Sequence, residues 1–270
     1  MKILLYRAQR SMGDDVACIP CVMQLRKLYP QAHISWSGHR EVGMLALVDE
    51  LVSFGIVKIN KDGVFEKEGV DWLKQFDLVI SWLLFMDSPA LRQELGLGKL
   101  VCITNNVHAD VYMPTQYLQS LCNGLKIAPG IVDYGFPVLP TERKGTVLLL
   151  PRGNNPYKQW MFSHWANLAV ALPEAPLLVI DSDSWMISNS ILKKRKCEVL
   201  PRTSLPDLVK RFGTLKSFVG LDTGLSHLAG AVGLPGVFMM FDAWNGWKIP
   251  SPVKCMSNRA TVEEVLAALV

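Results

Sequence analysis

Residues 218–240 read FVGLDTGLSHLAGAVGLPGVFMM, and this stretch decides the fold. Phe218–Leu221 is an apolar run typical of a buried strand, Thr223–Val232 has the pattern of a helix, and Gly236–Met240 is a second apolar run. A strand, a helix and a strand in close succession place both strands parallel in one sheet. The sequence therefore predicts a domain built on a parallel sheet.

The same alternation extends through the rest of the chain. Earlier in the C-terminal half, the expected elements are the strands Thr146–Leu150 and Pro176–Ile180 and the helices Phe162–Leu172 and Ser204–Phe212. In the N-terminal half they are the strands Lys2–Tyr6, Ile34–Trp36, Leu78–Trp82 and Leu100–Ile103 and the helices Val16–Leu28, Val70–Phe76 and Met113–Leu125. Two such series predict an α/β protein with two doubly wound, Rossmann-like domains facing across a cleft.

A change of texture marks the expected boundary between the domains. Glycine, proline and a polar run cluster near 136–145, which is typical of a linker. The expected domains are therefore 1–140 and 146–260. The final segment, 261–270, is expected to be a closing helix with Thr261 as its N-cap. Ligands of such sheets bind at the carboxyl ends of the strands, so the site is expected in the cleft.

The composition excludes several classes of protein. The chain has 270 residues, of which 50% are hydrophobic, and its net charge of +4 is too small to predict nucleic-acid binding. The charge-free run Leu78–Met86 is shorter than the ~18 residues a membrane-spanning helix needs, and Lys2–Tyr6 is too short for a signal peptide. Six irregularly spaced cysteines are typical of reduced thiols. We therefore expect a cytoplasmic protein without an integral membrane segment.

The loop after the first strand, Arg7–Asp15, combines two arginines with two carboxylates. Gly13 is its single glycine, so the loop lacks the glycine pattern of nicotinamide-binding Rossmann enzymes, and Gly13 is expected to allow a tight turn. Asp14 is either the N-cap of the next helix or a general base that projects into the cleft. Arg7 and Arg10 are either surface charges or contacts for an anionic acceptor.

Residues 151–160, PRGNNPYKQW, form the expected loop at the start of the second domain. Glycine and asparagine expose backbone N–H groups, and Lys158 adds a positive charge, so the loop has the character of an anion cradle. It is not a P-loop, because the Gly-Lys-Ser/Thr ending is missing. An ordinary turn with a solvated Lys158 is the alternative.

The segment Asp222–His227 follows the strand that ends at Leu221. Thr223 can cap the next helix and Gly224 lets a ligand approach the backbone, at the helix end that attracts a diphosphate. A packed, hydrogen-bonded histidine is the alternative for His227. Its clustering with the preceding carboxylate favours a functional role.

Asp181 and Asp183 follow another expected strand. Acidic residues at a strand end often accept hydrogen bonds from ribose hydroxyls, although a simple turn is equally consistent with the pattern. The Asp-x-Asp spacing also fits a metal site, so ribose, metal and no ligand all stay open for this pair.

Cysteines and tryptophans supply the remaining signals. Cys18 and Cys21 have the spacing of a redox motif, but they fall on the apolar face of an expected helix, which favours core packing. Trp160, Trp244 and Trp247 either stack on a base or sugar or pack in the core.

Three motifs, in this order along the chain, resemble one known family. They are Ser11-Met-Gly-Asp14 followed by Pro20, Lys158-x-Trp160, and Asp222-Thr-Gly-Leu-Ser-His-Leu228. On these motifs the chain is similar to the bacterial lipopolysaccharide heptosyltransferases of glycosyltransferase family 9. The resemblance implies a GT-B fold, with the acceptor on the N-terminal domain and the nucleotide sugar on the C-terminal one. It also implies inverting, metal-independent transfer of heptose from ADP-heptose to a lipopolysaccharide-type saccharide or glycolipid, without a cofactor and at most peripherally at the inner membrane face.

The resemblance also implies roles for single residues. Asp14 is implied as the general base and Lys158 as a catalytic contact of the diphosphate. The residues implied around the donor are Gly153, Asn154, Asp183, Thr203, Asp222, Thr223, Gly224 and His227. Arg7, Arg10 and Gly13 are expected around the acceptor. No residue is assigned to a metal.

Two other functions stay open. One is a family-9-like transferase that uses another nucleotide sugar on a capsule, O-chain or protein acceptor. The other is a non-catalytic protein that binds a nucleotide sugar, against which the intact Gly13-Asp14 pair argues.

Overall fold

The structure of the chain is a computed structural model. It describes residues 1–7, 11–53, 55–61, 64–96, 98–106, 109–137, 145–151, 158–179, 189, 191, 193–201, 203–240, 245–250 and 252–269. The chain forms two compact units. The N-terminal unit comprises Met1–Asn106 and Met113–Gly135, and the C-terminal unit comprises Val107–Tyr112 and Phe136–Val270.

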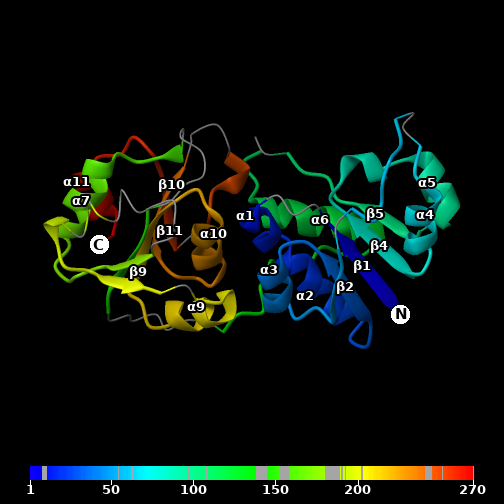
Figure 1. The fold of residues 1–270 in the computed structure, drawn as a ribbon, viewed down its shortest axis with the longest axis horizontal. Coiled ribbons are helices and arrows are strands. Elements are labelled where there is room, and N and C mark those ends of the chain that lie inside the picture. The colour runs from blue at the N-terminus through cyan, green and yellow to red at the C-terminus, as the bar shows by residue number, and fades with distance from the viewer. Residues whose placement is uncertain are drawn as a thin grey trace. The chain divides into compact units, whose positions relative to one another are not determined.

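The N-terminal unit contains a five-stranded parallel sheet in the order β3-β2-β1-β4-β5. Its strands are β1 Lys2–Tyr6, β2 His33–Ser37, β3 Glu50–Leu51, β4 Leu78–Ser81 and β5 Leu100–Cys102. Its helices are α1 Met12–Val16, α2 Ile19–Leu28, α3 Arg40–Leu45, α4 Lys67–Leu73, α5 Pro89–Leu95 and α6 Met113–Leu125, with a 3-10 turn η1 Leu84–Met86. Helices lie on both faces of this sheet (Figure 1).

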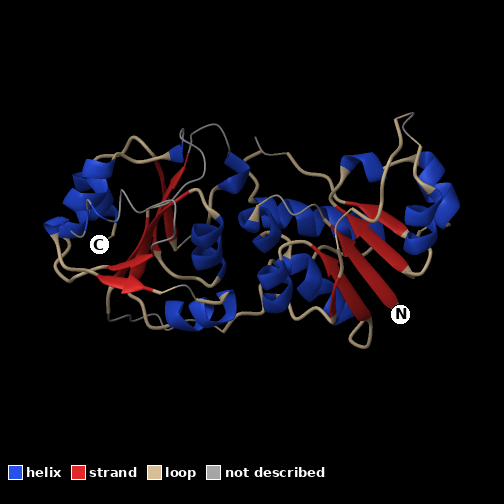
Figure 2. Cartoon of the chain, in the orientation of Figure 1, coloured by secondary structure: helices blue, strands red, loops and turns tan. Residues whose placement is uncertain are grey.

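The C-terminal unit contains a six-stranded parallel sheet in the order β11-β10-β9-β6-β7-β8. Its strands are β6 Val147–Leu150, β7 Leu177–Val179, β8 Glu198–Leu200, β9 Ser217–Leu221, β10 Gly236–Met240 and β11 Val253–Ser257. Its helices are α7 Phe162–Ala171, α9 Leu205–Phe212, α10 Gly224–Ala231 and α11 Val262–Ala268, with a 3-10 turn η3 Asn245–Trp247. Figure 2 shows strands and helices of both units by type.

Central strands are mainly apolar because parallel sheets are covered on both faces. In β1, the residues from Ile3 to Tyr6 are fully buried, and β10 is buried at every position. The α/β fold class with doubly wound parallel sheets is thereby confirmed.

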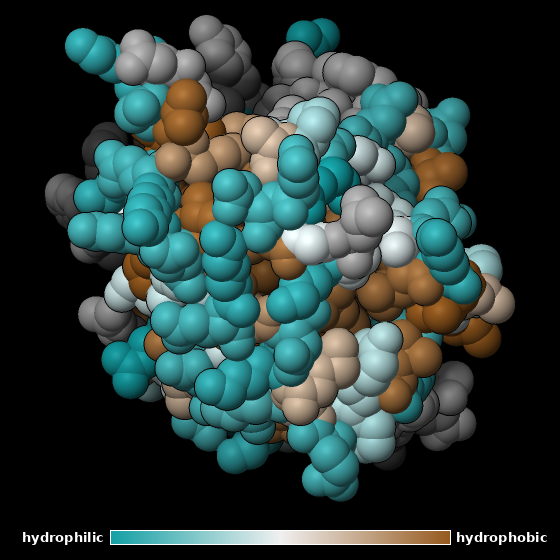
Figure 3. Space-filling model, turned by 90° about the vertical axis from the view of Figure 1, so that its right-hand side faces the viewer, coloured by the Kyte–Doolittle hydropathy of each residue, from teal (hydrophilic) through white to brown (hydrophobic). Residues whose placement is uncertain are grey.

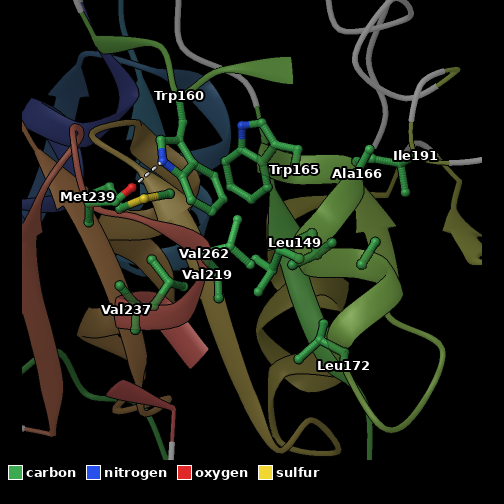
Figure 4. Close-up of a cluster of buried hydrophobic side chains, with 14 of the residues drawn as sticks. Leu149, Trp160, Trp165, Ala166, Leu172, Ile191, Val219, Val237, Met239 and Val262 are labelled. Atoms are coloured by element: carbon green, nitrogen blue, oxygen red, sulfur yellow. Dashed lines mark hydrogen bonds between the residues drawn. The ribbon is translucent and has the colours of Figure 1, made fainter. Parts of the chain in front are cut away.

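One core cluster of the C-terminal unit lies between its sheet and the helices α7 and α11 (Figure 4). Trp160 and Trp165 are both buried, and their rings meet edge to face with centroids 5.0 Å apart. The indole Nε1 of Trp160 donates to the carbonyl oxygen of Ala260 at 2.8 Å. The core interpretation of Trp160 is confirmed, whereas Trp244 lies outside the described residues.

The expected helix Val16–Leu28 is wrong in its limits, because two helices occupy this stretch. The first, α1, begins after Ser11 as its N-cap, and α2 begins at Ile19 with Pro20 in its first turn. Proline lacks the backbone N–H that a continuous helix would require, and it is tolerated in a first turn. Gly13 lies inside α1 with a negative φ, so the expected tight turn at this glycine is also wrong.

The closing helix α11 has the expected N-cap. Thr261 Oγ1 accepts from the backbone N–H of Glu264, and the Glu264 carboxylate accepts from the N–H of Thr261. This reciprocal capping box fixes the start of the helix.

The state of the cysteines and the polarity of the surface are those expected from the composition. All six cysteines are free, and Cys18 and Cys21 are buried, as core packing predicts. On the face in Figure 3, hydrophilic side chains predominate and apolar ones form scattered patches, as is usual for folded proteins. In the described part of the chain, no helix is both long and apolar enough to cross a membrane.

Candidate functional site

The main candidate site lies at the carboxyl edge of the C-terminal sheet. The neighbouring strands β6 and β9 run parallel, so the segments that follow them leave the sheet at the same edge. Lys158 belongs to the segment after β6, and Asp222 comes directly after β9. Side chains that are 64 positions apart in sequence therefore meet.

Asp222 is the centre of this cluster. Its side chain is 7% exposed, and each of its carboxylate oxygens has a partner. Oδ2 accepts from Lys158 Nζ at 2.5 Å, and Oδ1 lies 3.1 Å from His227 Nε2. Because an ionised carboxylate only accepts hydrogen bonds, Nε2 of the imidazole carries a proton in this arrangement. The sequence-predicted grouping of these residues is thus present in the structure.

The charges of the cluster depend on one another. Burial raises the pKa of Asp222, but hydrogen bonds and charge interactions with His227 and Lys158 outweigh burial and lower the pKa to about 2. The carboxylate is therefore ionised at neutral pH, and it fixes the position of the Lys158 ammonium group, whose side chain is 18% exposed.

His227 is held by rings as well as by the carboxylate. Its imidazole lies edge to face against Phe238 and Trp247, with centroids 5.1 and 5.2 Å away. The residue is 5% exposed, as the packed-histidine interpretation predicts. These rings and the hydrogen bond hold the imidazole against Asp222.

The helix α10 starts beside this cluster. Thr223 is its N-cap residue, but within the described residues its hydroxyl makes no capping bond and lies 3.4 Å from Ser226 Oγ. A Cβ on Gly220 would lie 2.2 Å from the same Ser226 oxygen, so glycine is needed on the strand beneath. N–H groups in the first turn of a helix are a general anion-binding feature.

A second cluster lies in the N-terminal unit, after β1. Arg7 Nε donates to Asp15 Oδ1 at 2.6 Å, and Arg7 Nη2 lies 3.6 Å from Asp14 Oδ1. The guanidinium also lies 5.9 and 5.8 Å from the ring centroids of Trp82 and Tyr117. Arg7 is 8% exposed, so the surface-charge alternative for it is wrong.

Asp14 is not a helix N-cap. That position belongs to Ser11, and Asp14 occupies the third residue of α1, where its side chain is 30% exposed. A carboxylate in the first turn of a helix interacts favourably with the helix dipole. The capping alternative for Asp14 is therefore wrong, while its role as a base stays a prediction.

Asp15 is the residue that the sequence interpretation missed. It is fully buried, and its Oδ2 accepts from the backbone N–H of His39 at 2.5 Å. Burial raises the pKa of Asp15, opposed by Arg7 and the His39 N–H. The sequence signal for it was the pair of adjacent acids, Asp14 and Asp15. Successive residues of a helix point in different directions, so one of the two carboxylates can face the core.

A polar groove of about 590 Å³ lies beside α6 in the same unit. Gln116 fastens the loop after β5 to the helix, because its amide bonds both the N–H and the carbonyl of Asn106, at 2.7 and 3.0 Å. The described residues that line the groove are uncharged: Cys102, Thr104, Asn105, Asn106, Gln116, Gln119, Ser120, Asn123 and Gly124.

The other predicted site residues lie apart from these clusters. Thr203 is partly buried, and its hydroxyl donates to the carbonyl of Pro201 at 2.6 Å. Four predicted positions fall outside the described residues: Arg10, Gly153, Asn154 and Asp183. The described residues contain no group of three or more His, Cys, Asp or Glu side chains that could hold a metal ion.

The chain is similar to known proteins in the sequence of one segment and in its fold. Residues 125–240 match the model of glycosyltransferase family 9 (heptosyltransferase). The structure of E. coli heptosyltransferase WaaC with ADP-2-deoxy-2-fluoro heptose has 16% sequence identity and a TM-score of 0.69, over 100% of this chain and 98% of that one. E. coli ADP-heptose lps heptosyltransferase II has 19% identity and a TM-score of 0.68, over 100% and 98%. No curated protein sequence matches the chain.

A third similar structure is a glycosyl transferase family 9 protein from Veillonella parvula, with 13% identity and a TM-score of 0.67 over 95% and 85% of the two chains. These similarities define the fold class: the chain has the GT-B architecture of a class of glycosyltransferases. Within that class, the match over residues 125–240 confirms the expected resemblance to family 9, the heptosyltransferases.

Proposed function

We propose that the C-terminal unit binds the diphosphate of a nucleotide sugar at the Lys158–Asp222–His227 cluster. The observation that carries the proposal is the hydrogen-bonded Lys158–Asp222 pair at the start of α10. An ammonium group held at the N-terminus of a helix is suited to a diphosphate. Gly153, Asn154, Thr203 and Asp183 are proposed as further donor contacts.

The proposed donor is ADP-heptose. The match to family 9 and the ligand-bound structure of the WaaC relative support this choice. Other nucleotide sugars are the second candidate for the same cluster, since a diphosphate is common to all of them.

The N-terminal unit is the proposed acceptor side, with Asp14 as general base. Asp14 is partly exposed beside a buried, positively charged Arg7, and a carboxylate in reach of solvent can take a proton from a bound hydroxyl. The amide-lined groove at α6 suits a saccharide, because amides offer donors and acceptors side by side, as sugar hydroxyls do. Arg7, Arg10 and Gly13 are proposed to border the acceptor.

The proposed reaction inverts the anomeric centre without a metal or cofactor. The acceptor oxygen forms a bond to the anomeric carbon while its proton passes to Asp14. The bond from that carbon to the diphosphate breaks, and its electron pair leaves with the nucleotide diphosphate. Lys158 and the N-terminus of α10 stabilise the added negative charge.

A lipopolysaccharide-type saccharide is the proposed acceptor, and the cytoplasmic face of the inner membrane is the proposed place of action. A direct test measures turnover of ADP-heptose by the purified chain with a lipopolysaccharide-core acceptor. Release of ADP together with a heptosylated product of inverted configuration supports the proposal. Binding of ADP-heptose without turnover on any saccharide acceptor would instead support a non-catalytic binding protein.

A further inference from the structure

Besides the groove at α6, a cavity lies within the C-terminal unit. It lies at the amino ends of the strands, whereas Asp222 lies at their carboxyl ends. It has a volume of about 290 Å³, and it is lined by the first residues of β6 and β9 and by the last turns of α7 and α11. β9 begins at Ser217 and ends at Leu221, directly before Asp222. The strand therefore separates this cavity from the proposed diphosphate cluster.

The walls of the cavity are mainly apolar. Val147, Leu172, Leu266 and Leu269 supply aliphatic side chains. Leu172 forms the lower end of the core cluster in Figure 4, and the other three pack against that cluster. The cavity is therefore an extension of the apolar core. Water would find few hydrogen-bond partners in it, whereas an apolar molecule would be stabilised there by leaving the solvent.

Ser217 places one polar group in these walls. Successive side chains of a strand point to opposite faces, so Ser217 points to the same face as Val219 and Leu221, which belong to the core cluster. The residue is 5% exposed, and its Oγ has no hydrogen-bond partner among the described residues. A buried hydroxyl without a partner is destabilising, and a ligand with a hydrogen-bonding group would satisfy it.

Among the described residues, two charged side chains of opposite sign line the cavity. Glu174 and Lys216 are both exposed. An anionic or cationic ligand would face one attractive and one repulsive charge, which favours a neutral ligand. An apolar cavity of ~150 Å³ admits benzene, so a volume of about 290 Å³ suits a molecule of about eight to twelve non-hydrogen atoms.

We infer that this cavity is a binding site for a small neutral amphiphile, with an aliphatic body among Val147, Leu172, Leu266 and Leu269 and one hydroxyl-like group on Ser217. The site is independent of the proposed transfer reaction. Its occupant stabilises the folded C-terminal unit, because a ligand that binds only the native state raises its stability.

The experiment uses the full chain and 1-octanol as the probe, with ligand-observed NMR and thermal unfolding as readouts. We expect saturation transfer to the alkyl chain and a saturable rise in Tm. Octanoate, the anionic analogue, is expected to bind more weakly. Absence of saturable 1-octanol binding, or octanoate binding as tightly as the alcohol, would overturn the inference.

Two variants locate the probe. Ser217→Ala is expected to weaken 1-octanol binding about three- to tenfold, the usual value of one hydrogen bond. The same variant is expected to leave the ligand-free protein at least as stable as the wild type, because it removes an unpartnered hydroxyl. Leu266→Trp is expected to fill the cavity and abolish binding.

Ser35→Ala is the matched control. Ser35 is also a buried strand serine, but its Oγ donates to Glu50 at 2.7 Å. Its loss is expected to lower stability and leave octanol binding unchanged. If Ser217→Ala destabilised the ligand-free protein as Ser35→Ala does, or left octanol affinity unchanged, Ser217 would not be part of a ligand site.

Discussion

Lys158 Nζ donates to Asp222 Oδ2 at 2.5 Å. The motif that begins at Asp222 therefore binds the ammonium group of a lysine from another loop. Two loops that leave neighbouring parallel strands are thereby joined at one edge of the sheet. The carboxylate that accepts from the lysine is buried, and its second oxygen lies 3.1 Å from His227 Nε2. The pair therefore combines a structural bond with a positive charge suited to a diphosphate.

The first prediction concerns the charge of Lys158. Lys158→Ala is expected to weaken ADP binding and to lower turnover more than binding, because charge on the leaving diphosphate grows in the transition state. The loss of one charge-assisted contact is worth about 1.5–3 kcal/mol. Calorimetry with ADP and steady-state kinetics measure both effects.

Lys210→Ala is the control for this prediction. Lys210 also pairs with an aspartate, Asp207, at 3.3 Å, but its side chain is 79% exposed. ADP affinity and turnover should stay at the wild-type value in the control. Equal kinetics in Lys158→Ala and Lys210→Ala would remove Lys158 from the donor site.

The second prediction separates chemistry from structure at Asp14. Asp14 is inside the first turn of α1 and not its N-cap, so Asp14→Asn removes no capping bond. We expect nearly unchanged Tm and ADP affinity, with turnover lower by ~10²–10⁴-fold, as for loss of a general base. Turnover close to the wild-type value with a verified acceptor would exclude Asp14 as the base.

The third prediction concerns the acid stability of the Asp222 cluster. The pKa of Asp222 is lowered from 3.8 to about 2 in the folded protein, so its ionised form stabilises the fold above about pH 4. This contribution, about 2 kcal/mol, is lost as the pH falls from about 4 to about 2.

Comparison with Asp222→Asn isolates this group, since the other carboxylates titrate in both proteins. The difference in the free energy of unfolding between wild type and variant should be constant from pH 7 to 5 and should shrink toward pH 2. Urea unfolding at each pH measures it. A difference that does not change with pH would show that ionisation of Asp222 does not stabilise the fold.

The fourth prediction concerns the amide groove of the N-terminal unit. Gln119 and Asn123 line it and are exposed, whereas Gln116 is used to hold the loop after β5. Gln119→Ala combined with Asn123→Ala is expected to raise KM for the saccharide acceptor several-fold and leave ADP affinity and Tm unchanged. An unchanged acceptor KM would place the acceptor elsewhere.

The fifth prediction concerns metal. Lys158 and the N-terminus of α10 offer fixed positive potential for the diphosphate, so transfer is expected to persist in excess EDTA. Activity that EDTA abolishes, that Mg²⁺ or Mn²⁺ restores, and that Asp183→Ala removes again would contradict the metal-free mechanism.

The sequence predicts the central elements well, because their patterns are continuous. Helix α6 and strand β10 have the predicted limits, and β1 is the predicted run of buried residues. The short strands at the sheet edges were missed. β8 is a three-residue strand with a charged residue, and β11 mixes lysine and serine with apolar residues, so neither shows the continuous apolar run of a central strand.

The site was predicted less evenly than the fold. Asp222 and His227 lie on one turn of chain, so their proximity follows from local geometry. The contact with Lys158 depends on the order of strands β6 and β9, which spacing alone does not reveal. Asp15 was missed because burial of a carboxylate depends on tertiary partners, here Arg7 and the His39 N–H.

The central claim is that the Lys158–Asp222–His227 cluster receives the diphosphate of a nucleotide sugar. The most direct measurement is photocrosslinking of an ADP analogue that carries its reactive group on the terminal phosphate, followed by mass-spectrometric mapping on the full chain. We predict crosslinks in the peptides that contain Lys158 and Asp222–His227, and their loss in the presence of excess ADP. Crosslinks that map only to residues before 130 would contradict the account.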